Sequence, residues 1–534
     1  MVQKGADLNM KRQTVLGGSL ILVASAMVAK VFGAVFRIPL TAMLGGEGMG
    51  YFSTAYGLFL PIFTLSVTGV NTAVAALTAR LLSSGDAGGA RLLHRRSLRM
   101  FGGIGFAAAL MLYLFAEPIC TYLLQNRGAA WAVRCFAPAV FFCSVNAVLR
   151  GAWEGREDMR PTAVSQAAES AARLALGLFL CRYVLLHGDT LPFPVTPQTR
   201  PMYAAAAAIL GVSGSTAVGT AVILCCAGQK KPAPPTRTDA QTLLRDLWRL
   251  ILPISAAALV TNLTSLVDLT TGMQCLKQMY QRDFAQNGFS SSEAAANFMY
   301  GAFSGMSVTV FNLVPSIVNM LGKGVLPAFS RAYAQNDKAA MKSHAGVVLQ
   351  TTALLAMPSG LGIFAMSSPI LTFLFPSRPM EVAAAAAPLM ILGLAVIVLC
   401  LSVPLMSMLQ AADFASQSAF LMVWGAAAKL LCNLLLIPRL GLVGMAISTF
   451  VCYAVILLRA AVTFHRCIGF STHLLRFCIK PLIASALCAV SAFTLYPHIS
   501  RVMPQSATLL ISVLFGGIVY CISLWCLHIH ILKS

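Results

Sequence analysis

The chain has 534 residues, of which 58% are hydrophobic and only 10% are charged, and its formal net charge is +21. A water-soluble globular protein of this size needs far more polar surface, so the composition excludes that class and indicates a polytopic membrane protein. The positive charge does not indicate nucleic-acid binding, because no nucleic-acid-binding motif accompanies it.

Apolar runs of about 20 residues, the length that a helix needs to cross the hydrocarbon core, recur along the whole chain. We predict an all-α polytopic membrane protein with fourteen transmembrane helices. Lys and Arg cluster in the connections that share a side with the amino terminus, which predicts that both termini are cytoplasmic. The predicted spans are 14–36, 51–79, 98–116, 130–150, 161–186, 203–227, 249–272, 298–322, 344–367, 382–409, 416–438, 441–464, 475–496 and 507–530.

The first span carries two cations, Lys30 deep in the apolar run and Arg37 nearer its outer end. A charge at the bilayer centre costs about 2.5 to 3.5 kcal/mol, so each cation needs a compensating environment. The two residues face roughly the same way on a helix. We predict that both line a cavity, and the alternative for Arg37 is snorkelling to the interface. Glu47, at the outer mouth, is either a coupling group or a solvated turn residue.

The two halves of the chain can be superposed on each other. The segment ARLLSSGDAGGAR (79–91) ends the second span, and SRAYAQNDKAAMK (330–342) ends the eighth, at a constant offset of 251 residues. A six-helix unit repeated in this way keeps its orientation in the membrane. It predicts two lobes related by a pseudo-two-fold axis along the membrane normal.

The segment GQKKPAPPTRTDAQ (228–241) is rich in Pro and charge, as linkers are. We therefore assign residues 1–235 with helices 1 to 6 to an N-lobe, and residues 236–465 with helices 7 to 12 to a C-lobe. Residues 466–534 form two extra C-terminal helices, 13 and 14, outside the repeat.

The fifth span carries a charge of each sign, Glu169 and Arg173. They lie on one helix face with the acid nearer the amino end, which is the favourable order for an ion pair. Two interpretations stay open. The pair is a brace that locks the span against a neighbour, or Arg173 faces a wet cavity and binds a phosphate bidentately.

The second half contains its own embedded polar residues. Lys429, near Asn433 in the eleventh span, corresponds to Arg173 in the repeat. These two line the second-lobe cavity or form a polar packing pair. Asp268, late in the seventh span, is either an ion or proton site or the partner of a cation across the lobes.

The sequence contains no HExxH, GxSxG or Walker pattern, and its cysteines show no metal-ligand spacing. We therefore expect no enzyme activity, no metal and no cofactor. Coupling to H⁺, Na⁺ or the membrane potential would supply the energy for transport.

Three segments carry a family resemblance, KVFGAVFRIPLTAMLGGEGMGYFSTAYGLF (30–59), LRGAWEGREDMRPTAVSQAAESAAR (149–173) and AKLLCNLLLIPRLGLVGMAIST (428–449). They resemble the stage V sporulation protein B branch of the polysaccharide and lipid-linked-oligosaccharide flippases, in the MOP exporter superfamily. The resemblance implies a two-lobed transporter with a V-shaped central cavity in the bacterial cell membrane. It would move an undecaprenyl-diphosphate-linked saccharide, for peptidoglycan or another envelope polysaccharide, from the cytoplasmic to the outer leaflet.

Within that superfamily, Lys30 falls on a basic position that the lipid II flippases use in the cavity. The second span, LPIFTLSV (60–67), lacks their charge and the seventh carries Asp268 in place of their Arg, which argues against lipid II itself as the cargo. Two alternatives stay open. The first is a MATE-like cation-coupled multidrug exporter, which requires a net acidic cavity. The second is a non-transporting scaffold of an envelope-synthesis or sporulation complex. Such a scaffold would bind envelope proteins, and Glu169 and Arg173 would only brace its helices.

Overall fold

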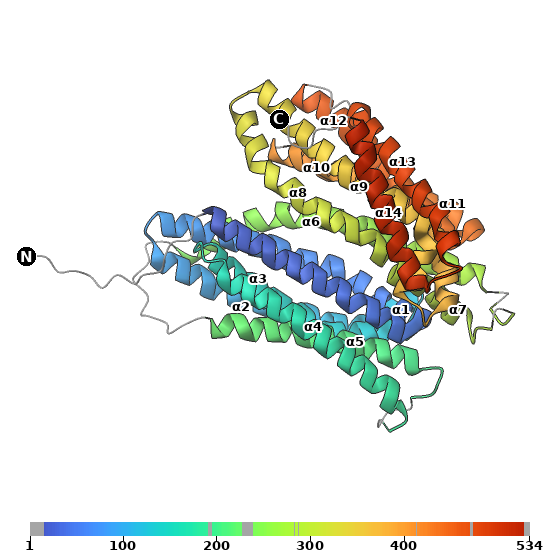
Figure 1. The fold of residues 1–534 in the computed structure, drawn as a ribbon. Helices are drawn as coiled ribbons and strands as arrows, with labels where there is room; N and C mark the ends of the chain where they lie inside the picture. The colour runs from blue at the N-terminus through green and yellow to red at the C-terminus, as the bar shows by residue number, and fades with distance from the viewer. Residues whose placement is uncertain are drawn as a thin grey trace, which may run out of the picture.

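A computed structural model describes residues 15–190, 195–226, 239–281, 284–286, 288–412, 414–469 and 474–527. Throughout these ranges the regular secondary structure is helical (Figure 1). Most of the predicted linker at 228–241 lies outside the described residues, as does the side chain of Lys30.

The helices follow one another with short connections. They are α1 (Val15–Ser83), α2 (Ala87–Pro118), α3 (Ala130–Glu154), α4 (Arg160–His187), α5 (Arg200–Cys225), α6 (Ala240–Met279), α7 (Ser292–Ala302), α8 (Val308–Ala334), α9 (Lys338–Leu374), α10 (Pro379–Ala411), α11 (Ala415–Leu440), α12 (Leu442–Ile468), α13 (Leu474–Ile499) and α14 (Gln505–Cys526). A π-helical turn, Phe303–Ser307, joins α7 to α8.

The predicted spans fall within these helices to within a few residues. Among the described residues, twelve helical segments are long and apolar enough to cross a membrane. One of the twelve lies in α1, which contains the first two predicted spans, and α6, which contains the seventh, is not among them. The chain is a multi-pass membrane protein.

Helix α1 folds back on itself at Gly45. This residue has φ 65° and ψ −172°, a conformation that only glycine adopts without strain. A continuous helix would separate Phe36 and Phe52 by roughly 24 Å, at 1.5 Å per residue. Their ring centroids lie 6.3 Å apart, so the first two spans pack side by side.

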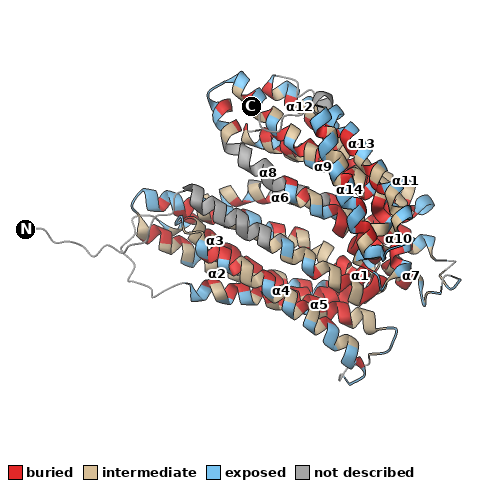
Figure 2. Cartoon of the chain, in the orientation of Figure 1, coloured by how far each residue is buried: buried red, intermediate tan, exposed pale blue. Residues whose placement is uncertain are grey.

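The helices form two lobes that meet at one end and diverge toward the other (Figure 1). At the meeting end, a single apolar core contains residues of both, such as Phe136 of α3 and Phe375 at the end of α9. Away from it the core divides. One cluster unites α1, α2, α3 and α6 around Leu93, and another unites α8 to α12 around Phe329 and Phe464. Buried residues accordingly concentrate where the lobes meet (Figure 2).

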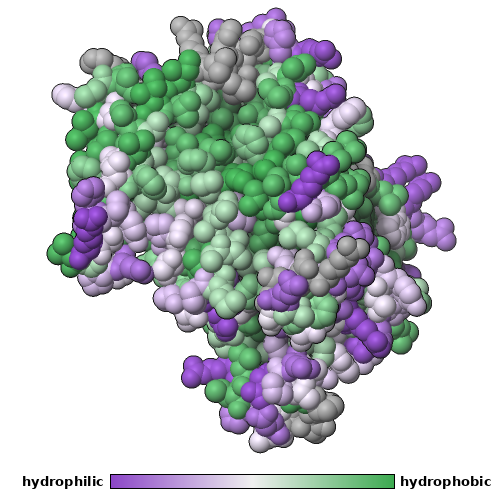
Figure 3. Space-filling model, turned by 90° about the vertical axis from the view of Figure 1, so that its right-hand side faces the viewer, coloured by the Kyte–Doolittle hydropathy of each residue, from purple (hydrophilic) through white to green (hydrophobic). Residues whose placement is uncertain are grey.

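The surface at the meeting end is mixed. Seen from that end, hydrophilic side chains gather in one part of the surface, beside a hydrophobic flank (Figure 3). This distribution fits a membrane protein whose end lies in water and whose flank contacts acyl chains.

The predicted repeat is confirmed by the turns that begin α2 and α9. Asp86 caps α2 and Asp337 caps α9, each accepting a hydrogen bond from a first-turn backbone amide. The preceding residues, Gly85 and Asn336, are both left-handed, with φ 77° and 54°. The same turn is therefore built twice, 251 residues apart.

Residues at the same offset also touch each other between the lobes. Ser304 Oγ donates a hydrogen bond to Ser53 Oγ at 2.8 Å, across 251 residues. A Cβ on Gly301 would lie 2.5 Å from the backbone nitrogen of Gly50, at the same offset. A residue can touch its own repeat counterpart only near the axis that relates the two halves. These contacts place the pseudo-two-fold axis between α1 and the α7–α8 segment.

Two further packing features lie outside this symmetry. Helix α13 packs against α9 and α14, so the two extra helices flank the second lobe. The first turns of α6 contribute Leu243, Leu247 and Ile251 to the core of the first lobe. Helix α6 therefore contacts both lobes along its length.

Candidate substrate site

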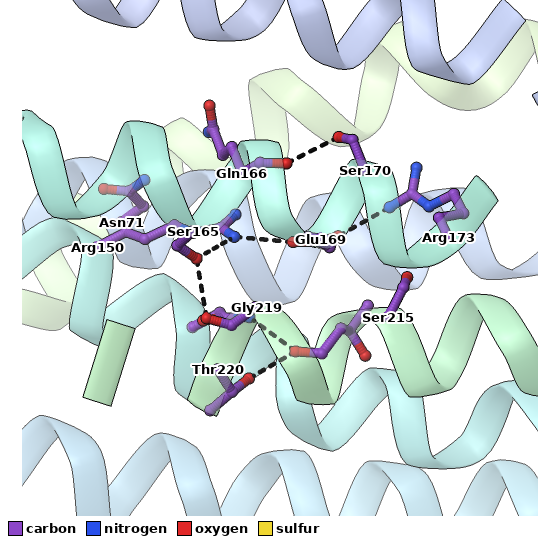
Figure 4. Close-up of polar contacts among 12 residues, drawn as sticks. Asn71, Arg150, Ser165, Gln166, Glu169, Ser170, Arg173, Ser215, Gly219 and Thr220 are labelled. Carbon is purple, nitrogen blue, oxygen red and sulfur yellow. Dashed lines mark hydrogen bonds and ion pairs between the residues drawn. The ribbon is translucent and has the colours of Figure 1, made fainter. Parts of the chain in front are cut away.

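Three charged side chains meet in the first lobe, and we call them the N-lobe charge cluster (Figure 4). Glu169 of α4 accepts from Arg173 one turn later through Oε1 and from Arg150 of α3 through Oε2, both at 2.8 Å. The pairing of Glu169 with Arg173 confirms the ion pair expected from their spacing. Two guanidinium groups against one carboxylate leave the cluster with a net charge of +1.

The backbone of α5 holds this cluster in place. Arg150 also donates to Ser165 Oγ at 2.9 Å, and Ser165 Oγ donates to the carbonyl of Gly219 in α5 at 2.9 Å. A Cβ on Gly219 would lie 3.2 Å from Glu169 Oε2, so glycine lets α5 approach the carboxylate. The cluster thereby ties α3, α4 and α5 together.

The two arginines of the cluster differ in accessibility. The side chain of Arg173 is 26% exposed, whereas those of Arg150 and Glu169 are 13% exposed. Arg173 donates to Glu169 through one Nη, and its Nε has no hydrogen-bond partner in the described part of the protein. A guanidinium carries five N–H donors, so Arg173 retains several for a ligand. The two interpretations are therefore compatible: Arg150 braces the helices, and Arg173 is left to bind a phosphate.

Arg150 was not among the predicted site residues. It ends the fourth span, and the charge bias of the connections favoured a cytoplasmic surface position for the basic run that it begins. One signal in the sequence could have revealed Arg150. The bundle contains more cations than carboxylates, and one carboxylate such as Glu169 can pair with two cations at once.

Arg37 contacts the other lobe instead of snorkelling to the interface. Its Nη2 donates to the carbonyl of Ser304 at 2.9 Å, and Thr41 Oγ1 one turn later donates to the carbonyl of Gly305 at 3.3 Å. Both carbonyls belong to the π-helical turn. Tyr56 of α1 lies near both Arg37 and Arg173, so the two cations lie in one neighbourhood.

The second lobe contains a different arrangement, which we call the C-lobe charge cluster. Lys429 Nζ of α11 lies 2.6 Å from Asp268 Oδ2 of α6. Asn433 donates to Asp268 at 3.2 Å and to Thr271 at 2.9 Å, and it accepts from Ser448 of α12. The Lys429 side chain is only 4% exposed. The pair is neutral, and the Asp268 side chain is 18% exposed.

This geometry corrects one expectation. Asp268 was expected to serve as an ion site or to pair with a cation across the lobes. Its partner, Lys429, comes from the same lobe, because α6 and α11 pack together there. Lys429 and Asn433 thus contact Asp268 within one lobe, while the ion-site role of Asp268 and the cavity role of Lys429 and Asn433 stay predictions.

At the meeting end, charged side chains of the C-lobe bind the backbone of α1 where this helix reverses at Gly45. We call this contact the α1 latch. Arg378 donates to the carbonyls of Ala42 and Met43 at 2.9 and 3.0 Å, where the first span ends. Glu381 accepts a hydrogen bond from the backbone amide of Gly46 at 3.1 Å, where the second span begins. Each charge thus opposes the partial charge of the helix end that it contacts. Neither charged residue was predicted from the sequence.

A second contact, the α6–α7 latch, closes the other half of this end. Lys277 Nζ donates to the carbonyl of Gln125 at 3.2 Å, and Glu293 accepts from the amide of Gly128 at 2.8 Å. Between them, the side-chain amides of Asn126 and Asn297 exchange two hydrogen bonds at 2.8 and 3.1 Å. With both latches made, this end of the molecule is closed between the lobes.

Glu47 lies beside the α6–α7 latch and accepts from the hydroxyl of Tyr51, one turn later, at 3.1 Å. It is therefore hydrogen-bonded within α1 rather than fully solvated. Whether it takes part in coupling is not decided by this contact, and its predicted role stays a prediction.

Comparisons with known proteins bear on the family and the fold of this chain. A family model described as "Polysaccharide biosynthesis protein" matches residues 15–333. Stage V sporulation protein B of Bacillus subtilis (strain 168) is 24% identical over 451 residues, which cover 82% of this chain and 81% of that protein. Lipid II flippase MurJ of the same organism is 22% identical over 498 residues, 89% of this chain and 87% of that protein.

The fold also matches a solved structure, that of lipid II flippase MurJ in an inward closed conformation. The TM-score is 0.70 over 96% of this chain and 99% of the solved chain. At 15% sequence identity, this likeness establishes a shared transporter fold.

Proposed function

Because this chain belongs to the polysaccharide biosynthesis protein family, we propose that it is a flippase for a polyprenyl-diphosphate-linked saccharide. The cargo head group moves from the cytoplasmic to the outer leaflet between the two lobes by alternating access, while the polyprenyl tail stays in lipid. The relatives named as a lipid II flippase and a sporulation protein support an envelope precursor as the class of cargo.

One observation carries this proposal, the net positive charge of the N-lobe charge cluster inside a membrane-spanning bundle. A planar guanidinium fork matches the paired oxygens of a phosphate. Arg173, the most accessible member, is the residue that binds the diphosphate, and Arg37 adds a second cation nearby. Lys30 is the third proposed contact, by its position in the first span.

The direction of transport follows from the orientation that we propose, with both termini in the cytoplasm. The lobes then diverge toward the cytoplasm and are latched on the outer side, ready to receive cargo from the inner leaflet (Figure 1). An inside-negative potential drives anions outward by roughly 2.3 kcal/mol per charge per 100 mV. A diphosphate with about two charges gains twice that. The membrane potential is the proposed energy source.

Coupling to H⁺ or Na⁺ is an additional route. Asp268 would have to release Lys429 before it could bind a coupling cation, because the ammonium group occupies the carboxylate. Glu169 is similarly held between two arginines. We therefore place ion coupling after a rearrangement of one of these pairs.

A leaflet-resolved assay in reconstituted vesicles tests the proposal. Vesicles carrying the protein and an inside-negative potential should expose the head group of a polyprenyl diphosphate saccharide at the outer leaflet, and collapse of the potential should slow this exposure. Extrusion of cationic dyes instead would identify a multidrug exporter. No movement of either cargo would favour the scaffold alternative.

A further inference from the structure

Two adjoining hollows of opposite character lie at the outer end, one lined by both lobes and one by the first lobe. The first, of about 620 Å³, is polar and charged, and it is lined by residues such as Arg127, Lys277 and Glu293. The second, of about 580 Å³, is almost wholly apolar and includes Phe106, Tyr113 and Phe141. Two residues, Trp131 and Arg134, line both. The two hollows therefore adjoin at these side chains, and we call them together the outer amphipathic site.

In the orientation that we propose, the apolar part faces the bilayer at the depth of the outer leaflet. It lies between the last turns of α2 and the first turns of α3 and α5, all near the latched end. Phe106 and Tyr113 are 62% and 50% exposed, far more than core residues. A chain of an outer-leaflet lipid can fill this groove and cover these rings.

The polar part opens at the border between membrane and water. Trp131 is half-exposed and packs against Tyr203 at 6.2 Å, as aromatic residues do at membrane interfaces. Arg134 stacks on Trp131 with its guanidinium 5.0 Å from the ring centroid and pairs with Glu117 at 3.1 Å. Arg134 thus sits where the head group of a lipid would join its tail.

The charges of this hollow favour an anion with a polar extension. Arg127, Arg134 and Lys277 face Glu117 and Glu293, and three cations against two carboxylates leave a net charge of +1. Carboxylates, the backbone near Gly128 and the hydroxyls of Ser291 and Ser292 add hydrogen-bonding groups around a volume larger than a bare phosphate fills. Phosphate, sugar hydroxyls and a flanking aromatic ring match this lining.

From these contacts we propose that the outer amphipathic site binds a saccharide-bearing polyprenyl phosphate lipid in the outer leaflet. The phosphate lies against Arg134, the sugar occupies the polar hollow, and the first isoprene units fill the apolar groove. This inference rests on the proposed function, since it makes the site a station for the lipid after transport. The site is separate from the N-lobe charge cluster, which lies on α3, α4 and α5 residues deeper in the lobe.

Photocrosslinking tests the site directly. We would place p-benzoylphenylalanine at Leu210, which lines the groove, and in a control chain at Leu514, an exposed residue nine positions from the outer end of α14. The probe is a tagged short-chain polyprenyl diphosphate bearing one N-acetylglucosamine. We expect a strong crosslink at Leu210 and a weak one at Leu514. Equal crosslinking at both positions, or a crosslink from Leu210 to another polypeptide, would overturn the proposal.

Competition identifies the ligand. Excess unlabelled saccharide lipid should abolish the Leu210 crosslink, whereas the same lipid without its sugar should compete more weakly and phosphatidylglycerol hardly at all. Phosphatidylglycerol that competes as well as the saccharide lipid would show a general lipid groove and sink the idea. Equal competition by the sugar-free lipid would show that the site does not recognise the saccharide.

Variants of Arg134 complete the test. Arg134→Gln should weaken the Leu210 crosslink about tenfold, the loss expected for a charge-assisted hydrogen bond. Arg134→Lys keeps the charge, so it should lose less, and Arg501→Gln, on the outer loop before α14, should lose nothing. An unchanged crosslink in both Arg134 variants contradicts the assignment. Failure of the inference with intact lipid transport leaves the proposed function standing, and loss of transport in the wild type would remove both.

Discussion

The two charge clusters occupy related places in the repeat and yet have opposite characters. Arg173 in α4 and Lys429 in α11 are counterparts, and each pairs with a carboxylate. In the N-lobe the carboxylate is shared by two arginines, and the cluster is positive and partly exposed. In the C-lobe one lysine meets one aspartate, and the pair is neutral with its lysine buried.

This difference shows how a duplicated bundle can divide its work. A neutral pair with a buried lysine contributes to the folding of the second lobe but leaves no excess positive charge for an anion. The positive cluster retains donors, so it can hold the lobe together and still bind a charged head group. We therefore expect variants of the two clusters to separate stability from transport.

The largest effect should come from Asp268→Asn. This change leaves the buried Lys429 ammonium unpaired and should lower the free energy of unfolding by about 3 to 5 kcal/mol. Thermal unfolding of the purified protein in detergent measures it. The double variant with Lys429→Met should recover most of the stability and keep transport. A double variant as unstable as the single one would contradict the pairing.

Glu169→Gln should have a smaller effect on stability, about 1 to 3 kcal/mol, because the arginines that it leaves are partly exposed. The cluster would then carry +2, since the carboxylate charge is lost. We expect tighter binding of the diphosphate lipid and slower release, seen as a lower KM together with a lower kcat in the leaflet assay. Weaker binding would show that Glu169 positions Arg173 for the diphosphate, and that its negative charge does not limit the affinity of the cluster.

Arg173→Gln should reduce transport about tenfold or more and leave thermal stability almost unchanged, because Arg150 keeps the brace. Arg182→Gln, an exposed arginine two to three turns further along α4, is the matched control and should transport normally. Equal transport by both variants would exclude Arg173 as the receptor.

The smallest effect on stability should come from Arg37→Gln, which removes a single hydrogen bond to Ser304 between the lobes, apart from any loss of the cation that we propose near the diphosphate. We expect a loss of about 0.5 to 1.5 kcal/mol from the outer-latched state. Spin labels on the repeated turns at Ser84 and Gln335 would report it as a larger population of closely spaced labels. An unchanged distance distribution would show that the latches alone hold this state.

The sequence predicted the fold to a large extent. Hydropathy placed the spans, and the repeated turn around Asp86 and Asp337 predicted the two-fold arrangement. For the candidate site, the Glu169–Arg173 pair was predictable because both residues lie one turn apart on a single helix. The partners on other helices were not, because no local pattern records which faces of two helices meet.

What the sequence by itself determined is therefore what depends on local chemistry: the spans, their order, the repeated turn and the presence of charge within the bundle. The tertiary structure alone decided where each charge is neutralised. It joined Arg150 to Glu169 across 19 residues and Lys429 to Asp268 across 161, and it placed Arg378 on the fold in α1. Helix rotation and packing select these partners, since a charge in a dry bundle takes whichever opposite group the neighbouring helix presents.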